Sequence, residues 1–539
     1  MIMSNRILWI TILAVLHSYA AWAEKFDVVV YGGTAGGVIA AVSSAREGLK
    51  VALLEPGKHL GGMVSGGLSW TDFGRKEVIG GYALEFYRRA GKHYEMSRYG
   101  QEIAWMHEPH VAEDIFRQML REAHVTVLLD HRLREKSGVR KSGLTVTEIV
   151  MENGGAFAAD IFIDSSYEGD LMAQAGVSYT WGRESSEQYG EPLAGVRGET
   201  PKHQFTVNLS PRGADGRLLP EIHDHPAGTP GSADKKVQSY NFRLCFSDDP
   251  ANQIRFPKPE GYRAARYELL AHLLKARTAA EGAAPKLATL LKIDRIENQK
   301  ADVNNNGAFS SDYIGGSWDY PNATYAKRAE IWQAHKDYIA GLLYFLANDR
   351  QVPAATQKEL SVWGLCKDEF TDTGGWPYQL YIREARRMVG DFVMTQKDLQ
   401  TELTKPDPIG MGSYNSDSHN IERIVTPEGF VRNEGDMQVA VKPYQIPYRI
   451  MLPKASEARN LLVPVAFSAS HVAYSSVRME PQYMILGQAA GAAAKMAIQG
   501  KRAVQEIDSA ALTDRLRKRG AVMEYAPSTE RIVIPMLRK

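Results

Sequence analysis

The chain has 539 residues, of which 44% are hydrophobic and 24% charged, so it is long enough for a large core and more than one domain. Its 64 lysine and arginine residues balance 63 aspartate and glutamate residues, and without a basic tract the sequence argues against a nucleic-acid partner. Two cysteines, Cys245 and Cys366, exclude a disulfide framework and a cysteine-based metal site, and leave open whether they form a single bridge.

The N-terminus is typical of an export signal. Arg6 supplies the charged end, residues 7–16 are an apolar run, and Ala-Trp-Ala at 21–23 fits the cleavage rule. We expect residues 1–23 to be removed and the protein to be periplasmic or extracellular. An uncleaved anchor is the alternative, but the run is shorter than the about 20 residues that span a bilayer. No later segment is apolar enough to cross, so we expect no integral membrane segment after cleavage.

Residues 26–55 have the pattern of a dinucleotide-binding unit. A β-rich run at 26–30 enters a glycine-rich turn, an alanine-rich helical segment ends at Gly48, and a second apolar strand ends at Glu55, 23 positions after Gly32. The helix N-terminus would offer free N–H groups and a positive dipole to a pyrophosphate. We expect Glu55 to bind the hydroxyls of the adenosine ribose.

Thr34 departs from the usual G-x-G-x-x-G pattern, because it stands where the second glycine is expected. Its Cβ restricts the approach of the backbone to phosphate, whereas its hydroxyl can donate to a phosphate oxygen. A purely structural turn is the alternative. The cofactor-binding residues that we predict in this turn are Gly32, Gly33, Thr34, Ala35, Gly36 and Gly37.

Two further Gly-Gly pairs, Gly61-Gly62 and Gly66-Gly67, lie in the loop after the second strand. Such a loop lets a second stretch of backbone follow a long flat cofactor, which favours FAD over NAD. We therefore expect Gly61, Gly62 and Met63 to contact FAD. No second glycine turn with a downstream acid occurs, so a nicotinamide cofactor in the same chain is not expected.

Six segments together make the sequence resemble the FAD-dependent oxidoreductase family of exported bacterial proteins, itself related to glutathione-reductase-like and fumarate-reductase-like flavoproteins. The segments are residues 27–37, 53–74, 162–179, 381–399, 411–420 and 478–497. The resemblance implies an α/β fold, with a Rossmann-like FAD-binding domain of the glutathione-reductase-like type and an inserted α+β substrate domain. In this branch the Gly-Gly-Thr form of the turn is usual.

The resemblance also implies a division of the chain. After the signal, the FAD-binding domain would occupy 24–175, the substrate or cap domain 176–445, the returning FAD-binding segment 446–500, and a C-terminal helical tail 501–539.

Two later segments are expected to reach the cofactor. In relatives the loop at Asp164 touches the adenine side of FAD, although here Asp164 is followed by serines where the relatives have Ala-Thr-Gly. A small-residue helix over 480–499 would point its N-terminus at the flavin pyrimidine. Its residues expected to lie near the cofactor are Gly487, Gln488, Ala489 and Ala490. An ordinary packed helix is the alternative.

The richest candidate for catalysis is the loop 410–423, in which His419 has Asp417 nearby. A histidine titrates near neutral pH and can move the proton that accompanies hydride transfer. The alternative is a histidine that only hydrogen-bonds loop carbonyls. Arg478, just before the last helix, is a candidate flavin or substrate contact.

Three arginines, Arg383, Arg386 and Arg387, have the spacing of one helical turn. One of them, for which we choose Arg387, would bind a carboxylate or reduced flavin, unless the cluster is a solvated basic face. The predicted catalytic residues are thus His419, Arg387 and Arg478. No metal site is predicted, because His223 and His225 lack a third ligand.

The segment 302–320 has three asparagines with Trp318 and Tyr320, a mixture typical of surfaces that hold hydroxyl-rich ligands. We expect hydride transfer between flavin N5 and a small polar substrate, with a carbohydrate favoured. An organic acid or C=C bond as substrate, and a non-catalytic cofactor- or glycan-binding protein, are the alternatives. The sequence does not identify the electron acceptor.

Overall fold

The computed structural model describes residues 24–528. The expected export signal, 1–23, lies outside the described residues, as does the end of the expected tail, 529–539. Within 24–528, no helix combines the length and the apolar character that crossing a bilayer requires.

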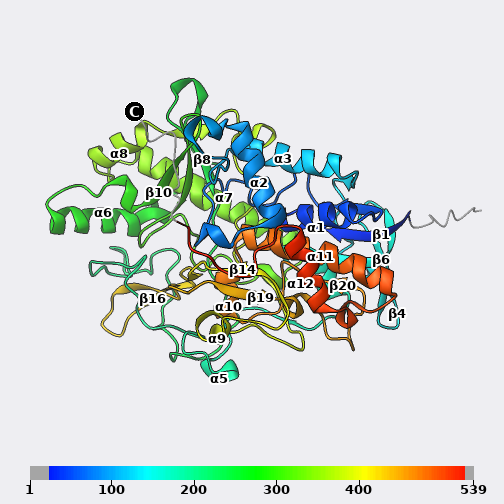
Figure 1. The fold of residues 1–539 in the computed structure, drawn as a ribbon. Helices are drawn as coiled ribbons and strands as arrows, with labels where there is room; N and C mark the ends of the chain where they lie inside the picture. The colour runs from blue at the N-terminus through cyan, green and yellow to red at the C-terminus, as the bar shows by residue number, and fades with distance from the viewer. Residues whose placement is uncertain (1–23, 529–539) are drawn as a thin grey trace, which may run out of the picture.

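A seven-stranded sheet in the order β3-β2-β1-β6-β5-β4, with β20 beside β6, organises one side of the molecule (Figure 1). Strand β1 is parallel to β2 and β6, and β20 is parallel to β6, whereas β4 and β5 are antiparallel additions. The strands are β1 (Glu24–Tyr31), β2 (Val51–Leu54), β3 (Thr126–Leu128), β4 (Val139–Ser142), β5 (Thr145–Val150), β6 (Ala156–Asp164) and β20 (Leu461–Leu462). This arrangement confirms the predicted α/β, Rossmann-like fold.

Helices α1 (Ala35–Arg46) and α11 (Glu480–Gly500) lie side by side against this sheet, although 445 positions separate Ser43 from Gln488 (Figure 1). Small residues allow the contact: a Cβ on Gly487 would overlap the carbonyl oxygen of Gly36. The Ser43 hydroxyl donates to the Gln488 carbonyl at 2.8 Å. The remaining helices of this part are α2 (Gly81–His93), α3 (Pro109–Glu122), α4 (Asp170–Gln174) and α12 (Ser509–Lys518).

A second sheet of five strands, in the order β10-β11-β8-β12-β9, lies on the other side of the molecule with three helices (Figure 1). Its strands are β8 (Leu244–Ser247), β9 (Gln253–Ile254), β10 (Leu291–Ile296), β11 (Lys300–Asn305) and β12 (Gly364–Cys366). The helices are α6 (Glu268–Glu281), α7 (Tyr325–Asn348) and α8 (Ala354–Ser361). The long helix α7 is the one that reaches back toward the first sheet.

Two-stranded sheets and short helices fill the remaining space between and below the two larger sheets. The paired strands are β7 (Tyr179–Thr180) with β13 (Arg387–Met388), β14 (Pro408–Gly412) with β19 (Tyr444–Pro447), β15 (Ser416–Ser418) with β18 (Met437–Val439), and β16 (Glu422–Val425) with β17 (Val431–Glu434). The helices are α5 (Ser186–Tyr189), α9 (Gln396–Gln400) and α10 (His471–Val477).

The segment 381–390 corrects one expectation. Arg383, Arg386 and Arg387 were predicted to share a helical turn, but the chain is extended there and only Arg387–Met388 form a strand. All three side chains are buried, so the alternative of a solvated basic face is wrong as well. Buried carboxylates draw each guanidinium inward, and these tertiary contacts outweigh the local helical spacing.

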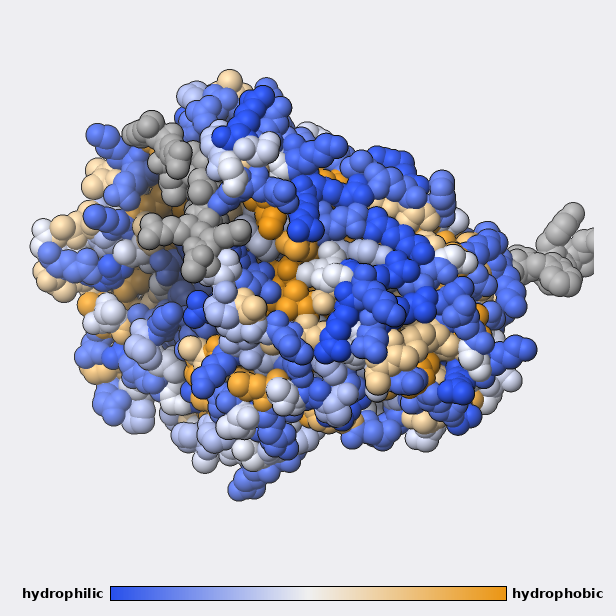
Figure 2. Space-filling model, viewed as in Figure 1, coloured by the Kyte–Doolittle hydropathy of each residue, from blue (hydrophilic) through white to orange (hydrophobic). Residues whose placement is uncertain are grey.

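The molecular surface in Figure 2 is mainly hydrophilic, with hydrophobic side chains in small patches. Among the described residues, the large hydrophobic side chains that stand exposed are Tyr99, Leu144 and Val362. Single exposed hydrophobic residues are ordinary on globular proteins.

Candidate active site

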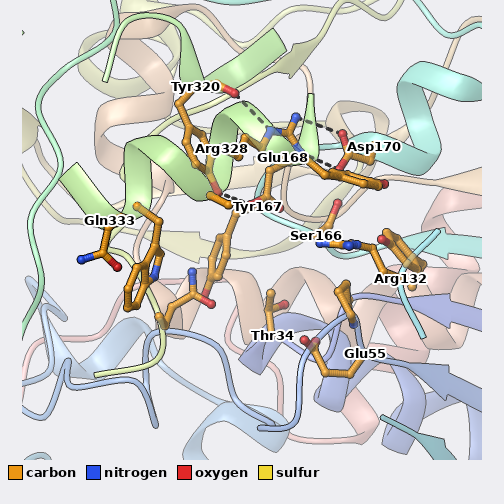
Figure 3. A pocket seen from close by; sticks show the side chains of 17 residues that line it. Thr34, Glu55, Arg132, Ser166, Tyr167, Glu168, Asp170, Tyr320, Arg328 and Gln333 are labelled. Atoms are coloured by element: carbon orange, nitrogen blue, oxygen red, sulfur yellow. Dashed lines mark hydrogen bonds and ion pairs between the residues drawn. The ribbon is translucent and has the colours of Figure 1, made fainter. Parts of the chain in front are cut away.

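A cavity of about 490 Å³ opens at the carboxyl end of β1. Figure 3 shows helix α7 on one side of it and the glycine turn with Glu55 on the other. The carboxyl end of a parallel strand is where open α/β sheets bind ligands, and the volume lies in the usual range for ligand sites. The residues that line the cavity include Tyr31, Gly32, Thr34, Glu55, Arg132, Ser166, Tyr167, Glu168, Asp170, Tyr320, Tyr325, Arg328, Trp332, Gln333 and Gln379.

Thr34 caps the helix that starts at the cavity. Its hydroxyl oxygen accepts a hydrogen bond from the Gly37 N–H at 3.1 Å and donates to the Ser165 carbonyl at 2.9 Å. A threonine at this place is a standard N-cap. The N–H groups of Ala35 and Gly36, in the first turn of α1, have no intrahelical acceptor and are suited to an anion. Thr34 thus belongs to the cradle and is not a defect in it.

The backbone around the turn is packed as a close cradle. Gly32 has φ +95°, and a Cβ there would lie 2.7 Å from the Ser166 N atom. A Cβ on Gly36 would lie 2.9 Å from the Tyr483 carbonyl oxygen. Side chains at these two positions would therefore separate the turn from the strand and helix beside it.

Glu55 faces the same turn from the end of β2. Its Oε2 accepts from the Gly33 N–H at 2.7 Å and its Oε1 from the Gly57 N–H at 2.6 Å. Each carboxylate oxygen retains a second lone pair for a ribose hydroxyl. Burial raises the pKa of Glu55 to about 7, although the Gly57 and Gly33 N–H groups act to lower it. The acid, the free helix N–H groups and the narrow turn together fit a dinucleotide.

The loop with the Gly-Gly pairs runs beside this turn. The Gly61 N–H donates to the Gly33 carbonyl at 2.7 Å, and Gly62 packs against the Tyr167 ring. The Met63 N–H donates to the Tyr167 hydroxyl at 2.9 Å. Tyr167 lines the cavity, so Gly61, Gly62 and Met63 support its wall from behind.

Asp164 does not line the cavity, but it positions Ser166, which does. Its Oδ1 accepts from the Ser166 N–H and hydroxyl, at 3.0 and 2.7 Å, and its Oδ2 accepts from the Met172 N–H at 2.7 Å. Burial raises the pKa of Asp164 to about 6. The structure thus uses Asp164 to hold the turn at Ser166.

The small residues of α11 are also placed away from the lining. Gly487, Gln488, Ala489 and Ala490 are buried, with Gly487 directly over α1. The Gln488 side-chain oxygen accepts from the Tyr82 N–H at 2.8 Å. These residues hold α11 against α1, the helix that begins at the glycine turn.

The wall opposite the turn is charged. Arg328 of α7 binds both carboxylate oxygens of Asp170, at 2.7 and 3.0 Å, and Arg386 binds the same carboxylate at 2.6 Å. Tyr320 donates to Glu168 at 2.9 Å, as Figure 3 shows. Sequence reasoning missed this wall, because Arg328 and Asp170 are 158 positions apart.

A polar cluster, none of whose members lines the cavity, contains two of the predicted catalytic residues. We define it as Asp312, Arg383, Asp417, His419 and Arg478. The His419 Nδ1 is 2.8 Å from an Asp312 oxygen and its Nε2 is 3.5 Å from an Asp417 oxygen. Arg383 lies 3.0 Å from Asp312, and Arg478 lies 3.3 Å from Asp417. The structure thus brings His419 and Arg478 to one carboxylate.

A short segment runs from the cavity toward the cluster. Gln379 lines the cavity, and Arg383 of the cluster follows four positions later. The Arg383 guanidinium lies 4.6 Å from the centre of the Tyr381 ring.

The cluster controls the charge of His419. Burial, the largest effect, and Arg383 lower its pKa, but Asp312 and Asp417 outweigh them, so the pKa of His419 is raised above its usual value. Burial acts to raise the pKa of Asp417, yet His419 and Arg478 hold it well below its usual value. The two carboxylates thus stabilise the imidazolium form of His419.

Several buried polar atoms in and beside the cluster have no hydrogen-bond partner. They are the Nε atoms of Arg383 and Arg478 and the hydroxyls of Ser239, Ser416 and Ser418. Buried polar groups are nearly always hydrogen-bonded, so unpaired ones gathered in one place indicate where a polar ligand or water belongs. These donors and acceptors are available to a polar ligand or to water.

Arg387, the third predicted catalytic residue, is placed elsewhere. Its guanidinium contacts Glu384, lies 2.6 Å from Glu184, and donates to the carbonyls of Gly182 and Ala469. Arg387 is fully buried and is not part of the cavity lining. The structure therefore uses Arg387 as an internal ion-pair partner.

Glu480, at the first position of α11, is a carboxyl group without a cation beside it. Its Oε1 accepts from the Tyr167 hydroxyl at 2.7 Å, and its Oε2 is buried without a partner. Burial raises the pKa of Glu480 to about 8, against the opposing effect of Tyr167. Because Tyr167 lines the cavity, this pair can hold a proton one residue away from the ligand.

The segment 302–320 differs from the open sugar-binding surface that its composition predicts. The Trp318 ring stacks on His223 and its Nε1 donates to the Ile421 carbonyl at 3.0 Å, while Tyr320 is buried. The segment contributes Tyr320 to the cavity wall and Asp312 to the cluster. Sequence reasoning did not single out Asp312, because nothing local connects it to His419.

One group in the described part of the chain has the spacing of a metal site: Glu108, His110 and Glu369. The Lys300 ammonium lies 2.7 Å from a carboxylate oxygen of Glu108 and of Glu369. A lysine thus supplies the cation of this group, which we describe as an ion-pair cluster.

A family model described as FAD dependent oxidoreductase matches residues 27–516. No curated protein matches the sequence. Solved structures with partial likeness include THI4 of Thermovibrio ammonificans, with 18% identity over 30% of this chain and 66% of that one, and a TM-score of 0.22. The p-nitrophenol 4-monooxygenase PnpA from Pseudomonas putida DLL-E4 has 16% identity over 30% of this chain and 45% of that one, with a TM-score of 0.22. The L-amino acid deaminase from Proteus vulgaris has 14% identity over 33% of this chain and 54% of that one, with a TM-score of 0.22. The chain spans less than two thirds of the length of each.

Proposed function

Because the chain belongs to the FAD dependent oxidoreductase family, with FAD as its cofactor, we propose that it transfers hydride between the flavin and a small, neutral, hydroxyl-rich substrate such as a carbohydrate. Bound FAD supplies hydride chemistry at N5 of its ring system. The glycine turn, the α1 N-terminus and Glu55 would hold the dinucleotide. The cluster of Asp312, Arg383, Asp417, His419 and Arg478 would hold the substrate.

We favour a neutral substrate because both arginines of the cluster are already paired with carboxylates. Arg383 has Asp312 as its partner, and Arg478 has Asp417. An organic acid, the second candidate, needs a cation whose charge is not already balanced. The Nε–H groups of both arginines, which lack acceptors, can still donate to a hydroxyl or carbonyl oxygen. A neutral polar ligand satisfies these donors without adding a buried negative charge.

His419 would move the proton that accompanies the reaction. Asp312 holds its ring through Nδ1, which leaves Nε2 on the side of Asp417. As imidazolium, the ring can donate the Nε2 proton to a substrate carbonyl oxygen during reduction. At a pH above its raised pKa, the neutral ring can accept that proton from the corresponding hydroxyl during oxidation.

An anaerobic substrate screen tests the proposal. The holoenzyme is mixed with matched pairs, each a sugar or polyol and the sugar acid derived from it, and flavin absorbance near ~450 nm is followed. We expect a neutral member to bleach the flavin faster than its acid. Bleaching by acids alone would favour the organic-acid candidate, and no bleaching by either class would reject both substrate classes.

Export is a separate proposal, supported by the signal-like pattern of residues 1–23. N-terminal sequencing of the protein from fractionated cells tests it. A start near Glu24 in the exported fraction is expected, and an intact N-terminus in the cytosol would contradict it.

A further inference from the structure

We propose that Cys245 and Cys366 form a structural disulfide between β8 and β12 when the chain folds in an oxidising compartment. The proposal does not depend on the reaction proposed above. These are the only two cysteines in the chain, and no separate partner is available to either within it.

The strand register places the two residues opposite each other. Strands β8 and β12 are antiparallel, with Ser247 opposite Gly364 and Phe246 opposite Leu365. The same register puts Cys245 opposite Cys366, and their sulfur atoms are in contact. Directly opposed residues in antiparallel strands have Cα atoms about 4.5–5.5 Å apart, which lies within the about 4.4–6.8 Å that a disulfide accepts.

The surroundings suit a structural bridge better than a reactive thiol. Both cysteines are buried, in an apolar cluster with Phe370 and Tyr378. Burial, followed by the neighbouring Cys366, raises the pKa of the Cys245 thiol well above its usual value. The nearby ammonium of Lys300 is bound by carboxylates and does not reverse this effect. A thiol held neutral is a poor nucleophile and metal ligand.

The bond would join two neighbouring strands of the second sheet, β8 and β12. It would join positions 121 residues apart, and the chain between them includes α7, which lines the cavity. Tyr378 packs on the cysteine cluster and donates from its hydroxyl to the Ser65 hydroxyl at 2.7 Å. Ser65 lies in the glycine-rich loop that supports the cavity wall. The bridge would therefore steady both α7 and that loop.

The burial also fixes when the bond forms. Cys245 is 1% and Cys366 0% exposed, so an oxidant has no access once β8 and β12 are packed. During folding, the thiolate of one cysteine attacks a disulfide oxidant, such as glutathione disulfide, and releases one thiol. The second thiolate then displaces the other half of the oxidant. Two electrons pass to the oxidant, which becomes two thiols, and the protein thiols lose two protons.

Thiol alkylation followed by intact-mass analysis tests the bond. The full chain is directed to an oxidising compartment, purified without reductant, denatured, and alkylated with or without prior reduction. We expect no adduct before reduction and two adducts after it. The matched variant Cys245→Ser should take one adduct without reduction. Two adducts on the unreduced wild type, or a bridge between chains, would overturn the proposal.

Refolding in vitro tests whether the disulfide forms independently of the host that expresses the protein. Reduced, denatured protein is refolded with FAD and a glutathione redox pair, and the flavin-containing monomer is then alkylated. We expect the same intramolecular bridge, which excess dithiothreitol reduces only after the protein is unfolded. A refolded holoenzyme with two free thiols would overturn the proposal, and so would rapid reduction of the bridge in the native state.

Discussion

Replacing Thr34 with alanine tests whether this residue is the cap of the cofactor helix. The threonine hydroxyl makes two buried hydrogen bonds, one from the Gly37 N–H at 3.1 Å and one to the Ser165 carbonyl at 2.9 Å. The variant Thr34→Ala removes both, whereas Thr34→Ser keeps both and removes only a methyl group. The serine variant is therefore the matched control.

The two bonds set the expected magnitude. Loss of an N-cap costs about 1 kcal/mol, and a buried carbonyl left without a donor costs about 1–3 kcal/mol. Thr34→Ala should therefore destabilise the start of α1 by about 2–4 kcal/mol. Thr34→Ser removes one buried methyl group, which should lower the stability by about 1 kcal/mol.

Hydrogen exchange in the FAD-free protein measures the loss of stability at the start of α1 directly. A local measurement is needed because a chain of this size need not unfold in a single step. Amides of peptides covering α1 should exchange about 30- to 1,000-fold faster in Thr34→Ala and about 5-fold faster in Thr34→Ser, if exchange follows local opening. Equal protection in the two variants would refute the capping argument.

Three further substitutions separate binding, proton storage and structure. Above a pH of about 7, where the Glu55 carboxyl is ionised, Glu55→Gln should raise the FAD dissociation constant about tenfold or more, because it removes a charged acceptor of about 1.5–3 kcal/mol from the ribose site. A fluorescence titration in that pH range with an unchanged constant would contradict this. The pKa of Glu480, about 8 when folded, lies above its value of 4.5 in the unfolded chain, so wild-type stability should fall as pH rises from about 4.5 to 8. Glu480→Gln should remove that fall in stability, which amounts to up to about 4 kcal/mol. If the melting temperatures of wild type and variant change with pH in the same way from pH 5 to 9, the assignment of this fall to Glu480 is wrong. Arg387→Met should lower the melting temperature, because breaking a buried pair costs about 3–5 kcal/mol, while folded protein keeps its rate of flavin reduction. A normal melting temperature with lost reduction would restore Arg387 to catalysis.

The part of the site that the sequence predicts well is encoded locally. The strand, turn, helix, strand and acid follow one another within residues 26–55, and each has a pattern that depends on near neighbours. The small residues of α11 show the limit of this approach. Their pattern predicts a close approach, but only the three-dimensional packing shows that Gly487 approaches the carbonyl of Gly36.

The substrate side could not be predicted in the same way, because its residues meet only after folding. Asp312 and His419 are 107 positions apart, and no local pattern connects them. The spacing of the arginines at 383–387 does not specify a helix, since a spacing of three and four also occurs in extended segments. Arg383 and Arg387 diverge to different carboxylates, Asp312 and Glu184, and those partners lie far away in the sequence.

The rate of anaerobic flavin reduction by an active neutral substrate, compared in wild type and His419→Gln across pH, tests the account most directly. We predict that the variant retains FAD but reduces it about 10²- to 10⁴-fold more slowly. The wild-type rate should rise with pH through the raised pKa of His419, because oxidation of a hydroxyl needs the neutral ring, and this rise should be absent in the variant. A variant that binds FAD and matches the wild-type rate and pH profile would contradict the assignment of His419 and its cluster to the reaction.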